Sequence, residues 1–182
     1  MVSSRFDNVT FKEASLNGVN FRHANFNNTR ITRSHLSDIR IYAARFDNLA
    51  FSDSTLTGIN RNRRVGLPIA GTRLSLIRSC ISESYFGSAE IAELIMESTR
   101  LHDINLDGAE IRMARLADIY LDRVSLRKNR QDVPFRLGIL QSSGVRTTGT
   151  SLENTRIEGD FSTILPVDSS PESFSSDCKP SP

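Results

Sequence analysis

A five-residue spacing of large apolar side chains constrains this chain more than any other feature of its sequence. Eleven positions in this spacing carry Phe, Leu or Ile, namely Phe6, Phe11, Leu16, Phe21, Phe26, Ile31, Leu36, Ile41, Phe46, Phe51 and Leu56. Two residues before each of them lies a smaller or semi-polar side chain, such as Ala14 or Ser34. A period of five matches neither an α-helix nor an ordinary β-strand. It is typical of a chain that turns a corner every five residues and points two of each five side chains inward.

A second period, of twenty residues, indicates that each coil of this solenoid has four sides. The segment 6–9 (FDNV) recurs as 26–29 (FNNT) and 46–49 (FDNL). One coil is therefore predicted to contain twenty residues. We expect Asn8, Asn28 and Asn48 to stack at one corner, with each side chain hydrogen-bonded to the coil above or below. The alternative is that they are solvated turn residues, because Asn is common in turns.

Short motifs with alanine two residues before the inward position resemble the pentapeptide-repeat family. They are Ala14-Ser15-Leu16, Ala24-Asn25-Phe26, Ala44-Arg45-Phe46, Ala109-Glu110-Ile111 and Ala114-Arg115-Leu116. The resemblance extends over about two thirds of the chain. It implies an all-β fold, a right-handed four-sided parallel β-helix with four pentapeptides in each coil and the central Leu or Phe inside.

Lapses in the repeat divide the chain into five segments. We expect a first array over 1–60, a basic irregular break or loop over 61–75, a second array over 76–126, a C-terminal capping segment with partial repeats over 127–165, and a disordered tail over 166–182.

The break at 61–75 is where the inward pattern falters. Its inward slots hold Arg61, Gly66 and Gly71, and a proline in the segment cannot donate a ladder hydrogen bond. The five-residue frame nevertheless continues from Leu76 to Leu126 in phase with Phe6. We therefore favour one continuous helix with a weak middle over two arrays that meet at a loop.

If the twenty-residue count also continues through this break, it places later side chains on known faces. Phe86 then lies under Phe46, and Leu116 lies on the face of Leu56.

Acidic residues gather on the second array, which makes it the candidate partner-binding surface. Residues 76–126 hold nine acidic and five basic residues, whereas residues 1–60 hold five acidic and seven basic ones. The twenty-residue count brings a set of acids close together along two edges, namely Glu83, Asp103 and Asp122 on one and Glu90 and Glu110 on the other. The alternative is a solvated edge with interleaved arginines, namely Arg112, Arg115 and Arg123. The basic break adds three further candidates for partner binding, Arg61, Arg63 and Arg64.

The sequence contains no motif for catalysis, a metal or a cofactor. Its histidines, His23, His35 and His102, lack a second His or a Cys at ligand spacing. Gly66 and Gly71 are not followed by the Lys-Ser/Thr of a phosphate-binding loop. A filled β-helix also offers no cavity of its own for a substrate. We therefore predict a protein that is not an enzyme.

The leading functional hypothesis is a non-enzymatic scaffold that binds a partner protein. Polar repeats such as 51–56 (FSDSTL) resemble β-helix modules of bacterial virulence effectors, so one form of this hypothesis is a bacterial effector. The alternative is a DNA mimic that binds gyrase, like the quinolone-resistance proteins of the family. The net charge of +2 argues against mimicry, because duplex DNA carries a dense negative charge. Direct nucleic-acid binding is disfavoured too, since Arg61, Arg63 and Arg64 have no interleaved aromatic residues.

The sequence also bears on the compartment. It has no run of 18 apolar residues that would span a membrane. Residues 1–5 contain no apolar signal region for Sec export. Cys80 and Cys178 do not form a disulfide framework, which favours a reducing compartment. We expect the bacterial cytoplasm, or delivery into a host cell by a leaderless route.

Overall fold

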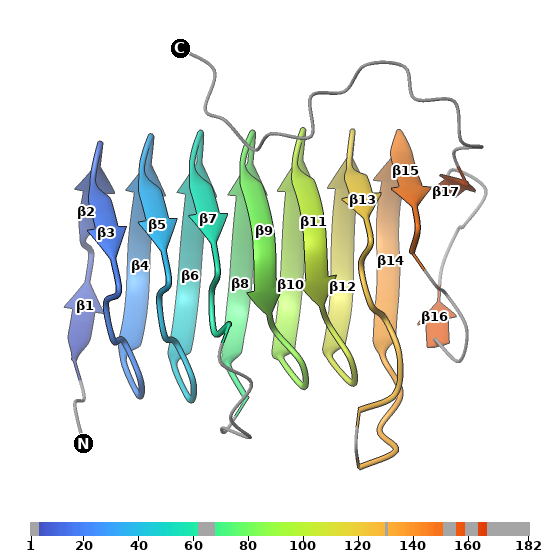
Figure 1. Ribbon diagram of the computed structural model, residues 1–182, viewed down its shortest axis with the longest axis horizontal. Coiled ribbons are helices and arrows are strands. Elements are labelled where there is room, and N and C mark those ends of the chain that lie inside the picture. The colour runs from blue at the N-terminus through green and yellow to red at the C-terminus, as the bar shows by residue number, and fades with distance from the viewer. Residues whose placement is uncertain (1–3, 62–67, 130, 151–155, 159–163, 167–182) are drawn as a thin grey trace.

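The protein folds into a stack of coils whose strands form two parallel sheets (Figure 1). The computed structural model describes residues 4–61, 68–129, 131–150, 156–158 and 164–166. These residues contain strands, turns and bends but no helix. The predicted all-β parallel solenoid is therefore confirmed.

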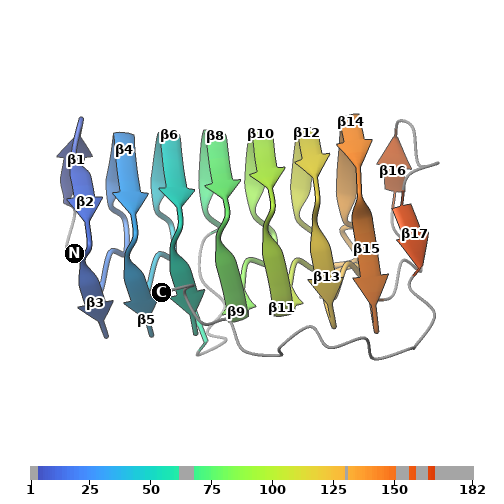
Figure 2. The same cartoon turned by 90° about the horizontal axis from the view of Figure 1, so that it is seen from above.

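Strands of successive coils lie side by side along the axis of the stack, as the view from above shows (Figure 2). The first sheet consists of β1 (Arg5–Asp7), β2 (Thr10–Lys12), β4 (Asn25–Thr32), β6 (Arg45–Ser52), β8 (Ala70–Ile77), β10 (Glu90–Glu97), β12 (Glu110–Ala117), β14 (Arg136–Ser143) and β16 (Arg156–Glu158). The second consists of β3 (Ser15–Asn17), β5 (His35–Ser37), β7 (Thr55–Thr57), β9 (Cys80–Tyr85), β11 (Arg100–Asn105), β13 (Tyr120–Asp122), β15 (Val145–Thr148) and β17 (Ile164–Pro166).

Corners between the sides are built by residues in the left-handed backbone region. Asn28, Arg33 and Asp38 have φ angles of 48°, 48° and 52°, five residues apart. Asparagine and aspartate tolerate this region better than most residues, which explains their frequency in the repeat. At one corner Asn48 Nδ2 donates a hydrogen bond to Asn28 Oδ1 over 3.1 Å. The predicted asparagine ladder is confirmed for this pair.

The two inward positions of each pentapeptide have different roles. The large side chains, such as Phe26 and Leu36, form the buried core along the axis. The smaller ones fill the corners, where a serine also accepts a backbone hydrogen bond from the preceding coil. Ser34 Oγ accepts from the Ala14 amide at 3.0 Å, and Ser54 Oγ accepts from the Ser34 amide at 3.1 Å. The semi-polar positions therefore satisfy buried amides that would otherwise lack a partner.

The stack is continuous through the break, but the coil there is longer. β6 pairs with β8 and β7 with β9, so the two arrays form one helix, as predicted. The register offset is twenty between Phe26 and Phe46 but twenty-five between Phe46 and Gly71. Five extra residues equal one side, so the five-residue frame survives while each later residue moves to the next face.

The placements of Phe86 and Leu116 from an unbroken twenty-residue count are therefore wrong. Gly71 and then Ile91 follow Phe46 in the ladder. Leu116 stacks on Met96, in the column that contains Leu76 and Phe51. The cause is the extra side, which a five-residue frame does not reveal.

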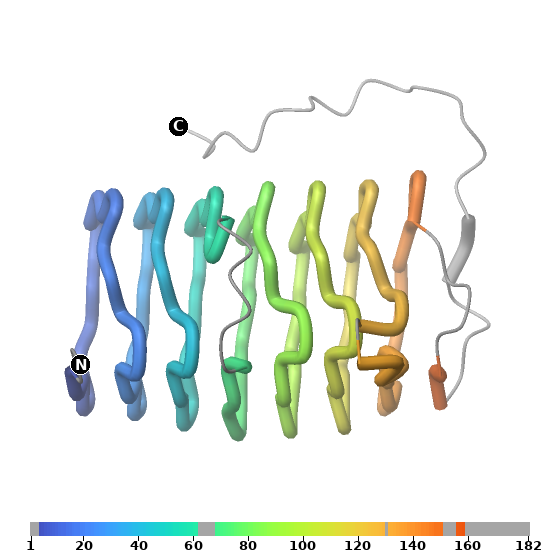
Figure 3. Tube along the Cα trace, turned by 60° about the horizontal axis from the view of Figure 1, so that its bottom comes forward, coloured from blue at the N-terminus to red at the C-terminus, as the bar shows by residue number. Residues whose placement is uncertain are grey.

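A second long coil lies between β12 and β14, where Glu110 pairs with Arg136 at an offset of twenty-six. This offset is one residue more than a multiple of five, and the pairing of β14 with β12 contains a register irregularity. In this part of β14, a Cβ on Gly138 would lie 2.2 Å from the Arg112 carbonyl oxygen. β14 and β15 then continue both sheets, so residues expected to cap the core also extend it. The Cα trace shows these coils along the same axis (Figure 3).

Candidate binding groove

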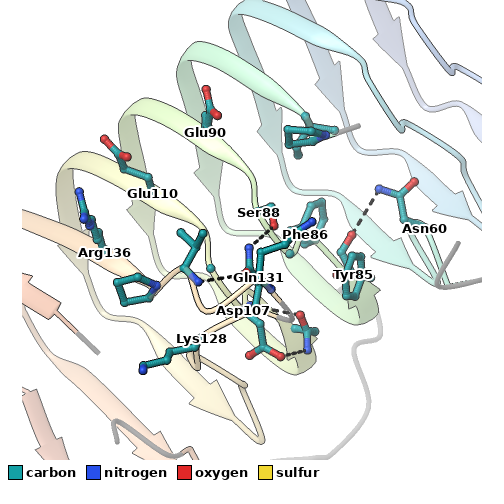
Figure 4. Close-up of a pocket in the computed structure, with 18 of the residues that line it drawn as sticks. Asn60, Tyr85, Phe86, Ser88, Glu90, Asp107, Glu110, Lys128, Gln131 and Arg136 are labelled. Atoms are coloured by element: carbon teal, nitrogen blue, oxygen red, sulfur yellow. Dashed lines mark hydrogen bonds between the residues drawn. The ribbon is translucent and has the colours of Figure 1, made fainter. Parts of the chain in front are cut away.

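A groove of about 550 Å³ lies on the outside of the stack, between the two long coils (Figure 4). Its floor comes from two coils of regular length, at 85–88 and 105–108. Pro68 and Ile69 line it on one side, and residues between Lys128 and Pro134 line it on the other. The groove therefore spans two regular coils, with described residues of the two longer coils at its sides.

Asn129 holds the second of these walls in place. Its Nδ2 donates a 2.9 Å hydrogen bond to Ser88 Oγ on the far floor coil. Its Oδ1 accepts from the amides of Gln131 and Val133 at 2.9 and 3.0 Å. Its side chain crosses Gly108, where an added Cβ would come within 2.7 Å of the Asn129 Cβ. The Asn129 side chain thus links the loop to the floor of the groove.

Asn60 holds the segment that carries the aromatic residues of the floor, Tyr85 and Phe86. Asn60 is only 3% exposed and donates from Nδ2 to the Tyr85 carbonyl oxygen at 3.3 Å. Its own carbonyl oxygen accepts from Tyr42 Oη at 2.9 Å. The Tyr85 ring lies over Gly87, whose Cβ, if present, would be 2.5 Å from Tyr85 Oη. Half-buried Phe86 packs beside it against the core.

Charged side chains line one edge of the groove, where Glu90, Glu110 and Arg136 stand in a row on successive strands (Figure 4). The Glu110 carboxylate is 3.4 Å from Arg112 Nε. Glu90 is exposed and makes no ion pair within 4.0 Å to any residue that the structure describes. These are two of the acids that the sequence singled out, and the structure brings them together.

The other two charged groups of the groove are committed to partners within the protein. Asp107 accepts hydrogen bonds from Ser125 Oγ at 2.6 Å, from the Arg127 amide at 3.0 Å and from Asn105 Nδ2 at 2.7 Å. Lys128 Nζ lies 2.9 Å from Asp132. Glu90 therefore carries a negative charge that is open to a ligand, next to the Glu110 carboxylate that Arg112 approaches at 3.4 Å.

The remaining acids of the expected column lie elsewhere, on the second sheet and its corner, and each has a cationic partner. Glu83 is 2.5 Å from Arg61. Asp103 accepts from Arg123 at 2.7 and 2.8 Å, and Asp122 lies 2.6 Å from His102 Nδ1. Arg63 and Arg64 lie outside the described residues. Arg61 and Arg123 are therefore interleaved with these acids, and Arg123 Nη1 also lies 3.3 Å from Asp122.

Comparison with known proteins identifies the repeat. Residues 4–41 match the family model for pentapeptide repeats in eight copies. The same spacing continues in the core of the structure as far as Leu126. This chain contains pentapeptide repeats and has the fold of a pentapeptide-repeat solenoid. No curated protein sequence matches it.

Two solved structures are similar to this pentapeptide-repeat solenoid. QnrB1, a plasmid-mediated fluoroquinolone resistance protein, is 12% identical, with 81% of each chain covered and a TM-score of 0.29. HetL, involved in heterocyst differentiation regulation in the cyanobacterium Nostoc, is 18% identical, with 81% of this chain and 73% of that chain covered and a TM-score of 0.36.

The corner of Asp103 gives the pentapeptide-repeat solenoid a pH-dependent contribution to stability. Hydrogen bonds from Arg123 hold the pKa of Asp103 below its ordinary value, against the opposing effect of burial. A lowered carboxyl pKa stabilises the fold above its unfolded-state pKa, near pH 4, and this contribution is lost as the pH falls through the lowered value.

We expect Arg123→Gln to destabilise the protein by less than about 1 kcal/mol at neutral pH, because exposed ion pairs contribute little. The deficit should shrink as the pH falls through the lowered pKa of Asp103, because the carboxyl then becomes protonated in both proteins. Thermal unfolding of wild type and variant at neutral pH and over a series of falling pH values measures it, with Arg112→Gln as the control. A deficit that stays constant with pH contradicts this account.

A second charged corner was not predicted from the sequence. Arg33 lies 2.6 Å from Glu13, and Arg78 lies 2.6 Å from Asp53 on later coils of the same edge. Hydrogen bonds from these arginines lower the pKa of both carboxyl groups. The sequence could have indicated this corner, because the charges of these four residues alternate in sign and are spaced one coil apart.

Sites for other chemistry were also sought. Among the described residues, no group of three or more His, Cys, Asp or Glu side chains could hold a metal ion, and no helix is long and apolar enough to cross a membrane. Cys80 is disulfide-bonded, which corrects the expectation of reduced cysteines. Cys178 lies outside the described residues.

Proposed function

We propose that this pentapeptide-repeat solenoid is a non-enzymatic scaffold that binds a partner protein in the groove. The supporting observation is the groove itself, with an aromatic floor held by Asn60 and a wall held by Asn129. Exposed Val133 lies at its rim, and Glu90 and Arg136 supply charges of both signs. Aromatic residues beside polar groups are typical of the parts of interfaces that contribute most binding energy.

Binding rather than catalysis is favoured by the state of the polar groups in the groove. Ser88 Oγ accepts a hydrogen bond from the side-chain amide of Asn129. An amide cannot act as the general base that would activate a serine nucleophile. The Asp107 carboxylate is held by three donors within the protein. Glu90 and Glu110 lie at the solvent-accessible edge of the groove, where their carboxylates are open to water.

Val133→Arg should abolish capture of the partner, whereas Met113→Arg should leave it unchanged. Both residues are exposed, at 44% and 48%, and both changes add the same charge. Val133 lines the groove, whereas Met113, in β12, does not. The measurement is affinity capture from bacterial and host lysates, with the bound proteins quantified by mass spectrometry. If both variants lose the captured proteins equally, or if neither variant loses them, the groove is not the binding site.

DNA mimicry is expected to fail as a function. Glu83, Asp103 and Asp122 are offset by Arg61 and Arg123, so they produce no extended negative field. We predict no inhibition of gyrase supercoiling and no protection of gyrase from quinolones at micromolar protein. Salt-sensitive inhibition that Glu90→Lys with Glu110→Lys removes would contradict this.

The bacterial-effector form of the scaffold hypothesis stays a prediction. A β-helix of this kind suits a partner in the bacterium and a partner in a host cell equally well. Parallel capture from the two lysates separates these cases, because the groove-dependent partner should come from only one of them.

A further inference from the structure

We infer that the occupant of the groove is an extended peptide segment with a lysine or arginine side chain, whose cationic end lies at Glu90 and Glu110. This inference rests on the proposed function and adds the chemistry of the partner. Its first observation is the register of β10 and β12, which places Glu90 directly opposite Glu110. Neighbouring strands are about 4.8 Å apart, a distance at which like charges repel.

Charged columns elsewhere on this stack resolve such repulsion with an arginine. Glu13 pairs with Arg33 and Asp53 with Arg78, both one coil apart in the ladder. Glu93 is approached by Arg73 and Arg115 from the coils on either side, at 2.6 and 2.5 Å. Glu110 has Arg112 of its own strand at 3.4 Å, but no described residue forms an ion pair with Glu90, so a cation from a partner beside Glu90 completes the pattern found in the other columns.

Space for that cation is available beside Glu90. The ladder neighbour on its other side is Ala70, whose short side chain does not cover the carboxylate. Arg136 follows Glu110 but forms no ion pair within 4.0 Å with it among the described residues. The remaining acid and base of the groove, Asp107 and Lys128, are already paired internally. The open charge is therefore negative and localised at one end of the row.

Apolar surface next to this charge indicates a peptide rather than a small cation. Phe86, Val133 and Pro134 line the same groove. Alternate side chains of an extended peptide point the same way, about 7 Å apart, so one cationic and one apolar side chain can occupy the two parts of the groove. A nucleic acid would instead bring phosphates against Glu90 and Glu110, which is unfavourable.

Selection from a random phage-displayed heptapeptide library tests this on the full chain. We expect bound peptides to be enriched in Lys or Arg next to an apolar residue. The affinity of a selected peptide, measured by titration calorimetry, should fall at least about tenfold in Glu90→Gln with Glu110→Gln, as for loss of a charge-assisted hydrogen bond. Asp118→Gln, an exposed acid outside the groove, should leave it unchanged.

Two other outcomes overturn the inference, and they are distinguishable. In the first, the selected peptides contain no basic residue but fail to bind the Val133→Arg variant. The groove would then still be the binding site, but its partner would not be cationic. Peptides whose binding ignores Val133→Arg refute the groove, and the proposed function with it. Circular dichroism of each variant establishes that the fold is retained before either conclusion is drawn.

Discussion

A Phe26→Asp variant is expected not to fold into the solenoid. Phe26 is 6% exposed, and its ring stacks on that of Phe6 at 5.0 Å and meets the edge of Phe21 at 5.5 Å. Removing such a side chain costs about 3–5 kcal/mol by itself. A carboxylate left there has no partner, and burying it costs several kcal/mol more. This sum is comparable with the whole stability of a typical domain, about 5–15 kcal/mol.

The matched control for this change is Asn25→Asp on the same strand. Asn25 is exposed and stands opposite Arg5 and Arg45 in the ladder, so a carboxylate there has cationic neighbours. Far-ultraviolet circular dichroism and thermal unfolding of both variants measure the effect. A soluble Phe26→Asp protein with the spectrum and melting temperature of the wild type would show that the inward assignment is wrong.

The fold was predictable because its physical cause is local. One inward side chain every five residues and a corner residue such as Asn28 specify the coil without any long-range information. The position of Phe86 was not predictable in the same way. An insertion of five residues between β7 and β8 adds one side and leaves the frame intact, so only pairing such as that of Phe46 with Gly71 reveals it.

The groove was less predictable than the fold, for two physical reasons. Glu90 and Glu110 were placed together because both lie in regular coils, where the twenty-residue count holds. The walls depend on loops that fold back against the stack, and the bond that secures one of them joins Asn129 to Ser88, residues 41 apart in the chain. No local pattern specifies such a contact.

Substitution of Gly71, which occupies an inward position of the repeat, is expected to have the second large effect on stability. The column that contains it holds Phe26, Phe46 and Ile91 in other coils, so the repeat pattern alone predicts that an apolar residue here would be stabilising. The structure predicts the opposite. A Cβ on Gly71 would lie 2.1 Å from ring atoms of Phe46, so the Phe46 ring already fills the space.

Gly71→Leu is therefore expected to destabilise the protein by at least about 1–3 kcal/mol, the usual cost of overpacking a core. Phe46→Ala alone should cost about 3–5 kcal/mol, because it leaves a cavity. Combining the two should cost clearly less than their sum, since the new leucine enters the space that the phenyl ring vacates. Residues in direct contact show such non-additivity, whereas distant ones do not.

Denaturant unfolding of wild type, both single variants and the double variant gives the coupling free energy directly. Thr72→Leu is the control, because it adds the same side chain to the exposed face of the same strand. We expect a coupling of at least about 1 kcal/mol in the stabilising direction, within the range for touching residues. Strict additivity would mean that Phe46 does not occupy the Gly71 slot. The lapse in the repeat would then reflect a tolerated defect rather than packing between neighbouring coils.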